Sequence, residues 1–426
     1  MNDDEDVEFQ AIVIDNGTAM CKAGGKDVYR NSGYYIPVVD TSDFLSVAGE
    51  DMPSAIFPSV ISRPRLQAVK TGMGQRDSYI GYEAQAKRDI LSLRYPVKCG
   101  VVTNWCDMER LWHHTIYNEL QLLPEELPIL LTEPSLNPNR NRERTIEIMF
   151  ESFNPPAFYL ANQAVLSLYG SGRTTGIVLD SGEDITHVVP IYEGSPIVHA
   201  INQVCMGGRH LTEYLAEALK DRADLSSLMY ANAVIQDVKE KLCYVALDPT
   251  WEKQSMETNS IKKVYELPDG NVITMDAERS VYQSILIIFV FLLLELGAET
   301  WLVHSFLIPD ALFRPSLMAL DTPGIQDLVH SSIRKCDVDL RRDFLDNVIL
   351  SGGTTMFPGI RERLEKELHV LFPTSMRVLI RAYPERKHQA WIGGSILASL
   401  STFQHLYVSK QQYDETGSII VHRSCL

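Results

Sequence analysis

Two short segments of the chain place an aspartate and a glycine directly after a run of branched apolar residues. Residues 15–18 read Asp-Asn-Gly-Thr after the apolar run 12–14, and residues 180–183 read Asp-Ser-Gly-Glu after the run 177–179. Backbone N–H groups in such turns bind phosphate, and aspartates at strand ends hold the water shell of Mg²⁺. Each segment alone is more simply an ordinary hairpin turn. Their repetition predicts two similar halves with one phosphate-binding turn each.

A third glycine turn supports a nucleotide site. Residues 351–354 read Ser-Gly-Gly-Thr and join the apolar run 348–350 to a helical pattern with Ile360, Leu364 and Leu368 on one face. Helix N-termini after glycine turns favour anions. The chain contains neither the GxGxxG nor the GxxxxGK[ST] phosphate motif. Three glycine turns after branched strands predict a nucleotide held between two domains.

The elements that must position these turns alternate between strands and helices. Strand character is clear over 129–131, and amphipathic helices are predicted after Asn104, after Asn137-Pro138 and after Gly207-Gly208. The small residues 170–172 form a candidate hinge between the two halves. This alternation predicts an α/β fold.

Composition and charge limit the class of protein. The chain has 426 residues, 45% of them hydrophobic, which is long for a single core and predicts at least two domains. The net charge of −16 argues against nucleic acid as the main partner and favours basic protein surfaces. Seven scattered cysteines without a CxxC pair predict a reducing compartment, no zinc site and no disulfide framework.

No targeting or membrane-spanning segment is expected. The acidic start of the sequence lacks the apolar stretch of a secretory signal and the basic character of a transit peptide. Residues 285–294 form an unbroken apolar run. A spanning helix needs about 20 such residues, so no transmembrane span is predicted.

Longer runs of sequence carry a family resemblance. The matching runs are 74–79, 102–105, 112–115, 163–176 apart from Gly170, 239–248, 351–356, 391–404 and 421–426. On these runs the chain resembles the actin family over almost everything outside two insertions. The resemblance implies an α/β, actin-type two-domain fold, in which duplicated RNase H-like halves with inserted smaller subdomains surround a nucleotide cleft.

The resemblance also implies subdomain boundaries. Subdomain 1 would comprise residues 1–58, 96–170 and 389–426, and subdomain 2 would comprise 59–95 with a mobile subunit-contact loop. Subdomain 3 would comprise 171–206 and 321–388, and subdomain 4 would comprise 207–320. The chain would cross between the domains near Gly170 and near Lys387.

The same resemblance implies the residues of an ATP or ADP site with Mg²⁺ or Ca²⁺. Gln163 and His187 would order the attacking water, with Asp15 and Asp180 as further catalytic residues. Asp15, Gln163 and Asp180 would contact the metal through water. The implied nucleotide-binding residues are Gly17, Thr18, Ala19, Met20, Lys22, Ser181, Gly182, Glu183, Asp184, Gly208, Lys239, Glu240, Gly352, Gly353, Thr354, Met356, Phe357 and Lys387.

Three functions follow as hypotheses. The resemblance implies a cytoplasmic, cytoskeletal protein that assembles into filaments, with slow ATP hydrolysis timing disassembly. Its partners would be its own copies and actin-binding proteins, at a groove around Tyr169 and Leu397 and at the acidic N-terminus. The alternative is a nonpolymerising actin-related subunit of a larger complex with a weakened ATPase. A metabolite kinase on the same fold is the third and most distant hypothesis.

Several substitutions depart from the family pattern. Thr18 and Ala19 replace serine and glycine in the first turn, and Asp184 replaces a glycine in the second. Asp184 is expected to restrict the backbone and to repel phosphates, which predicts weakened ATP affinity or altered hydrolysis. Lys70 puts a charge at a normally apolar position of the subunit-contact loop, which argues against ordinary polymerisation. Cys99 replaces a commonly methylated histidine, so that modification cannot occur.

Two insertions, residues 25–46 and 281–307, interrupt the family sequence. They are either functional elaborations or translated, unspliced intron sequence. Their abrupt boundaries and unusual composition favour the intron interpretation. A transcript that lacks both segments would confirm it, and peptides from residues 29–46 would contradict it.

Overall fold

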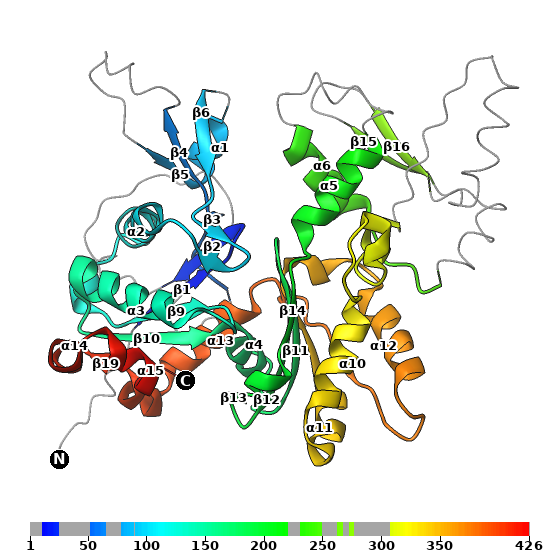
Figure 1. The fold of residues 1–426 in the computed structure, drawn as a ribbon. Coiled ribbons are helices and arrows are strands. Elements are labelled where there is room, and N and C mark those ends of the chain that lie inside the picture. The colour runs from blue at the N-terminus through cyan, green and yellow to red at the C-terminus, as the bar shows by residue number, and fades with distance from the viewer. Residues whose placement is uncertain are drawn as a thin grey trace, which may run out of the picture.

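The computed structural model describes residues 11–24, 52–64, 78–88, 90–219, 231–248, 262–266, 272–276 and 307–425 (Figure 1). The predictions for both insertions, the acidic N-terminus, Lys70 and the apolar run 285–294 lie outside these residues, except for Leu307. Within the described part of the chain, no helix is both long and apolar enough to cross a membrane.

The first half is built on a six-stranded sheet with the order β19-β10-β9-β1-β2-β3. β1 pairs with β2 in antiparallel and with β9 in parallel orientation, and β10 extends the parallel part. Ile12, Val13 and Ile14 have no exposed surface, because β1 lies inside the sheet. The strands are β1 (Ile12–Asn16), β2 (Met20–Gly24), β3 (Ala55–Pro58), β9 (Ile129–Glu133), β10 (Ala157–Asn162) and β19 (Val408–Ser409).

The predicted helices of this half are confirmed. α2 begins after Asn104, whose side chain accepts a hydrogen bond of 3.1 Å from the Asp107 N–H, and α3 begins after Pro138. Such a side-chain cap satisfies an N–H group that has no partner within the helix. The helices are α2 (Trp105–His113), α3 (Asn139–Ile148), α4 (Gln163–Tyr169), α13 (Gln389–Ser399), α14 (Lys410–Thr416) and α15 (Val421–Ser424).

Two small sheets extend the first half. A three-stranded sheet has the order β5-β4-β6 and packs with a short helix, and a separate hairpin follows it in the chain. These elements are β4 (Ile61–Pro64), β5 (Tyr79–Ile80), α1 (Gly81–Ala86), β6 (Leu91–Arg94), β7 (Val97–Lys98) and β8 (Val101–Val102).

The second half repeats the strand pattern of the first. β11 pairs with β12 in antiparallel and with β17 in parallel orientation, and β18 extends the parallel part. This is the arrangement that β1, β2, β9 and β10 have in the first half, so the predicted duplication is present. The strands are β11 (Gly176–Ser181), β12 (Thr186–Tyr192), β13 (Ser195–Pro196), β14 (Asn202–Val204), β17 (Val348–Ser351) and β18 (Ile380–Arg381).

Helices of the second half pack into one apolar core with the inner strands. The helix predicted after Gly207-Gly208 is confirmed, and a 3₁₀ turn over Gly353–Met356 precedes the helix predicted after the third glycine turn. The elements are α5 (Gly208–Leu219), α6 (Ala231–Leu242), β15 (Lys262–Glu266), β16 (Val272–Asp276), α9 (Leu307–Asp310), α10 (Ile325–Lys335), α11 (Arg341–Leu345) and α12 (Ile360–Leu371).

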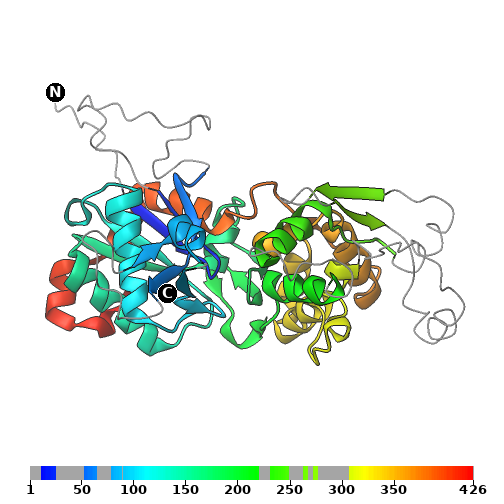
Figure 2. The same ribbon diagram turned by 90° about the horizontal axis from the view of Figure 1, so that it is seen from above.

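Helices α4 and α13 join the two halves, which lie side by side (Figure 2). At Gly393 a Cβ atom would lie 1.7 Å from the Leu166 carbonyl oxygen, so the close crossing of these helices requires glycine. The chain passes to the second sheet after Gly170 and returns to the first half at α13. The predicted hinge at residues 170–172 therefore lies where the chain crosses. The subdomain boundaries remain predictions.

Candidate functional site

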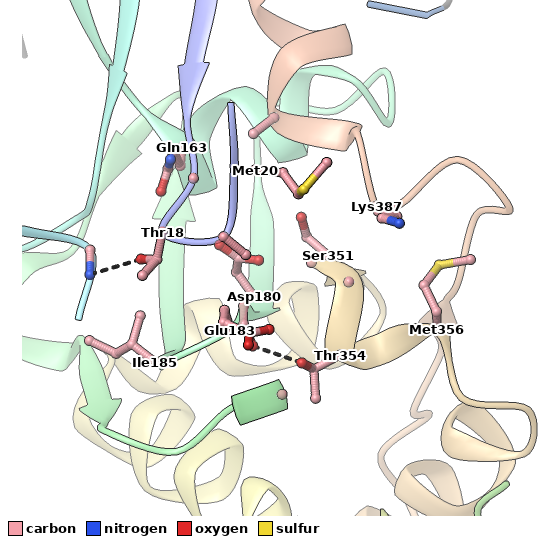
Figure 3. Close-up of a pocket in the computed structure, with 18 of the residues that line it drawn as sticks. Thr18, Met20, Gln163, Asp180, Glu183, Ile185, Ser351, Thr354, Met356 and Lys387 are labelled. Atoms are coloured by element: carbon pink, nitrogen blue, oxygen red, sulfur yellow. Dashed lines mark hydrogen bonds between the residues drawn. The ribbon is translucent and has the colours of Figure 1, made fainter. Parts of the chain in front are cut away.

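A cavity of about 430 Å³ lies between the two halves, and all three glycine turns line it (Figure 3). Every predicted site residue lines this cavity except Ser181 and Asp184. The β1–β2 and β11–β12 turns are therefore both hairpins and parts of one site. Residues more than 330 positions apart, such as Asp15 and Gly352, meet there because the two similar sheets face each other across the cavity.

Seven further residues line the cavity without having been predicted. Three of them stand within or beside the glycine turns, where the sequence already pointed, and four are brought in by tertiary contacts. They are Asn16, Ile185 and Ser351, and then Gly100, Pro134, Gln236 and Ala390. The spacing of residues in the sequence could not identify the last four, because they lie far from the glycine turns along the chain.

The first turn is held by its neighbours. The Ser59 hydroxyl donates to the Gly17 carbonyl at 2.8 Å. The Gly100 N–H donates to Thr18 Oγ1 at 3.3 Å (Figure 3). A Cβ atom at Gly17 would lie 2.5 Å from the Met20 carbonyl oxygen, so this turn requires glycine. Thr18 thus keeps the hydroxyl of the serine it replaces and uses it to contact the β7–β8 hairpin.

Asp15 is a buried carboxylate with several partners. It is 2% exposed, and Lys22 Nζ lies 2.6 Å from its Oδ2. Thr132 Oγ1 and Gln163 Nε2 donate to its Oδ1 at 2.8 and 2.9 Å. Burial alone raises the pKa of Asp15, but Lys22 and these donors outweigh it, so the pKa lies below its usual value. Asp15 is therefore ionised at neutral pH.

Asp180 lies across the same cavity in a different electrostatic setting. Burial raises its pKa to about 6, with Lys22 lowering it and the charge of Asp15 raising it. Two carboxylates thus share one lysine, which leaves a negative charge that a cation would balance. Carboxylate and amide oxygens suit Mg²⁺, so Asp15, Asp180 and Gln163 fit a hydrated ion. Among the described residues, no three or more His, Cys, Asp or Glu side chains cluster in a way that could hold a metal.

His187 faces the cavity as a neutral imidazole. It is 6% exposed, and its Nδ1 is buried without a hydrogen-bond partner among the described residues. Burial lowers the pKa of His187 to about 4. A buried polar atom without a partner, next to a cavity, fits a site that receives a water molecule or a polar ligand group.

His187 predicts a pH dependence of stability. The unfolded chain takes up a proton at the ordinary histidine pKa of about 6.5, whereas the folded protein does so only near 4. Stability should therefore fall between pH 6.5 and 4, by up to about 3 kcal/mol from this group. Denaturant unfolding across this range should show a flatter pH profile for His187→Gln than for the parent. His369→Gln, at an exposed position on α12, is the matched control and should keep the parent profile.

A second polar cluster occupies the side of the cavity formed by α5, α6 and the third turn. Lys239 Nζ donates to the Gly208 carbonyl at 2.8 Å. Thr354 Oγ1 donates to the Gly182 carbonyl at 2.7 Å (Figure 3). Burial raises the pKa of Glu183, and Lys239 opposes this shift. Met356 and Lys387 line the end of the cavity opposite Thr18 (Figure 3). This side combines a buried cation, a carboxylate and apolar surface, which suits a sugar and a base.

Ser181 and Asp184 lie beneath the second turn instead of facing the cavity. The Ser181 hydroxyl hydrogen-bonds to Thr186 Oγ1 at 2.8 Å, inside the protein. Asp184 is 4% exposed; its Oδ1 lies 3.0 Å from Arg209 Nε, and its Oδ2 accepts from the Cys99 N–H at 3.4 Å.

The position of Asp184 bears on the predicted loss of ATP affinity. Asp184 is not among the residues with positive φ, so its backbone does not require glycine. Arg209 balances its charge at short range. Weakened ATP affinity stays a prediction, but both causes that the sequence suggested for it lack support in these contacts.

A model of a protein family matches this chain over most of its length. The family model described as Actin matches residues 46–426, which is nearly the whole chain. The matched range includes the second and third glycine turns of the cavity, and the first turn precedes it.

Proposed function

Because the chain belongs to the actin family, we propose that it binds ATP with Mg²⁺ in the cavity between its halves and assembles into filaments. Slow ATP hydrolysis would then time the disassembly of the filament. The observation that carries this proposal is the meeting of three glycine turns with Asp15, Lys22 and Asp180 around one cavity. The duplicated halves and the family match support the same assignment.

Different residues of the cavity would bind the phosphates, hold the metal and orient the attacking water. The first and second turns would receive the phosphates through backbone N–H groups, with Lys22 contributing positive charge. Asp15, Asp180 and Gln163 would hold the water shell of Mg²⁺, which when bound neutralises phosphate charge. Neutral His187 and the Gln163 amide would orient a water molecule, so catalysis would depend on positioning and electrostatics.

The test of this function combines binding with sedimentation. Titration of the full chain with a fluorescent ATP analogue, with and without Mg²⁺, measures occupancy of the cavity. Sedimentation after addition of Mg-ATP and salt measures assembly. Binding together with a pellet supports the proposal, and the absence of saturable nucleotide binding contradicts it.

Gln163→Ala should slow phosphate release by about 10- to 100-fold, because an attacking water that loses its orientation reacts slowly. Nucleotide binding should change much less, since Asp15 keeps its contacts with Lys22 and Thr132. Phosphate release and analogue titration check the two parts. Gln411→Ala, which removes an exposed amide paired with Glu415 on α14, is the control and should behave like the parent. Equal rates for both variants would exclude Gln163 from the reaction.

Asp184→Gly should change ATP affinity by less than about threefold, because Arg209 already balances the Asp184 charge and the side chain does not line the cavity. Arg209→Gln should weaken binding more, since it leaves the Asp184 carboxylate buried without its cation. Analogue titration of both variants checks the ranking. Much tighter binding by Asp184→Gly would restore the earlier hypothesis that Asp184 repels the phosphates.

A second candidate function rests on the subunit-contact loop. Lys70 introduces a charge where the family loop is normally apolar, which favours a nonpolymerising subunit of a larger complex. Nucleotide binding without a pellet in the sedimentation test would select this alternative. Both candidate functions are compatible with protein partners that bind at the groove around Tyr169 and Leu397, where Leu400 and Leu406 are exposed.

A further inference from the structure

Cys99 occupies a tight turn that fixes its position. β7 and β8 pair with Lys98 opposite Val101, so Cys99 and Gly100 form a two-residue hairpin turn. Their φ angles are +46° and +75°, and two positive φ angles are the mark of a type I′ turn. Residues other than glycine rarely adopt a positive φ, and asparagine does so most readily. The thiol of Cys99 is therefore presented at a fixed point of the first half.

Cys205 approaches the same point from the second half. It directly follows β14, in which Val204 pairs with Thr186 of antiparallel β12. Continuing this register places Cys205 opposite Ile185. The β7–β8 turn touches that segment too, because the Cys99 N–H donates to Asp184 and a Cβ at Gly100 would lie 4.0 Å from Ile185 Cγ2.

The two cysteines are neighbours in space. Cys205 acts on the Cys99 thiol as a side-chain neighbour, and both cysteines are free. Cys205 is exposed and Cys99 is partly exposed, so a reagent in solution can reach the pair. Burial and the neighbouring Cys205 and Asp184 raise the pKa of Cys99, while Arg209 lowers it. Cys205 is the more exposed of the two thiols, so it is the better candidate for the first attack.

We propose that Cys99 and Cys205 form a reversible disulfide that ties the two halves together beside the nucleotide cavity. The oxidant would be a low-molecular-weight disulfide such as oxidised glutathione. The Cys205 thiolate attacks one of its sulfurs, which gives a mixed disulfide and releases one glutathione thiolate. The Cys99 thiolate then attacks Cys205 Sγ and releases the second. The two protein thiols lose two protons and two electrons, and the oxidant becomes two thiols.

The location of the pair predicts what the disulfide would do. Next to Cys99, the Gly100 N–H donates to Thr18 in the first turn. Beyond Cys205, the Gly208 N–H donates to the Gly182 carbonyl in the second turn at 3.0 Å. A bond between the cysteines would link the loops that support both turns and restrain separation of the halves. Nucleotide release should then slow down, an effect that rests on the proposed function, whereas formation of the disulfide does not.

The first experiment tests whether the disulfide forms. The full chain is equilibrated in glutathione buffers of increasing oxidised fraction, the thiols are blocked, and a non-reducing digest is analysed by mass spectrometry. We expect a peptide that joins Cys99 to Cys205 and disappears on reduction. Cys99→Asn keeps a residue suited to the turn, and Cys205→Ser keeps the size of the side chain; both should lack the peptide. Cys106→Ser, at the exposed cysteine of α2, should retain it.

The second experiment measures the consequence on the same samples. Release of a fluorescent ATP analogue should be several-fold slower from the oxidised parent and from oxidised Cys106→Ser, and unchanged by oxidation in Cys205→Ser. Glutathione adducts that persist on Cys205, or random pairing that includes Cys106, would overturn the disulfide. A linked peptide without slower release would overturn the restraint on the halves. A protein that forms the peptide but binds no nucleotide would contradict the proposed function and leave the disulfide standing.

Discussion

Replacing Lys22 with methionine is expected to lower the free energy of unfolding by about 3–5 kcal/mol at neutral pH, because it leaves a buried carboxylate without its cation. Lys22 Nζ lies 2.6 Å from the 2% exposed Asp15 and also lowers the pKa of Asp180. Methionine fills a similar volume without the charge. Removing the lysine from the phosphate side of the cavity should also weaken ATP binding by about 10- to 100-fold.

The pH dependence of the Lys22→Met effect separates lost charge from lost packing. In the parent, the lowered pKa of Asp15 contributes stability above its ordinary value of 3.8. Without Lys22, burial would raise the pKa of Asp15 above 3.8, so the variant loses stability as pH rises from 3.8 through that raised pKa. The difference from the parent should therefore grow with pH, as denaturant unfolding at several pH values can measure. A difference that is constant with pH would mean that packing dominates.

Lys87→Met is the matched control for this prediction. Lys87 forms a 2.8 Å pair with Glu83 on α1, but the two side chains are 40% and 46% exposed, so solvent screens the pair. Exposed pairs contribute little, so this variant should lie within about 0.5 kcal/mol of the parent and should bind nucleotide normally. Equal destabilisation by the two variants would contradict a special role for the buried pair.

Gly352→Ala should destabilise the fold by about 3 kcal/mol and distort the cavity, because two separate costs combine at this position. The φ angle of Gly352 is +88°, which disfavours any residue with a Cβ. A Cβ there would also lie 2.3 Å from the Ser181 carbonyl oxygen and 2.5 Å from Asp180 Oδ1. The strand end that carries Asp180 must therefore move, which should weaken nucleotide binding as well as stability.

Gly417→Ala separates these two costs. Gly417 has a φ angle of +78°, and a Cβ there would meet no atom within 4 Å. This variant should lose only the backbone cost of this φ/ψ region, about 2 kcal/mol, and should leave nucleotide binding unchanged. Denaturant unfolding and analogue titration of both variants measure the difference. If Gly352→Ala were no more disruptive than Gly417→Ala, the close approach at the cavity would be unimportant.

Much of the fold could be predicted because its signals are local. The branched run ending at Asp15 gave a buried strand, Asn104 capped a helix as expected, and Gly17 stood where a turn needs glycine. The duplication was visible in the sequence as a repeated motif, an apolar run followed by Asp-x-Gly, and the two sheets have the same arrangement of strands. The roles of Gln163, His187 and the other site residues came from resemblance to the actin family, since no local pattern assigns them.

Sequence alone therefore determined the α/β class, the two similar halves, the three glycine turns and the family. The signals for these features, namely secondary-structure propensity, turn residues and repeated motifs, are contained in short stretches of the chain. Tertiary structure decided which side chains meet. Asp184 pairs with Arg209, and Cys99 lies beside Cys205 across the two halves. The raised pKa of Asp180 and the neutral state of His187 likewise follow from burial between distant segments. Charge state and contact depend on neighbours in space, which the order of residues along the chain does not specify.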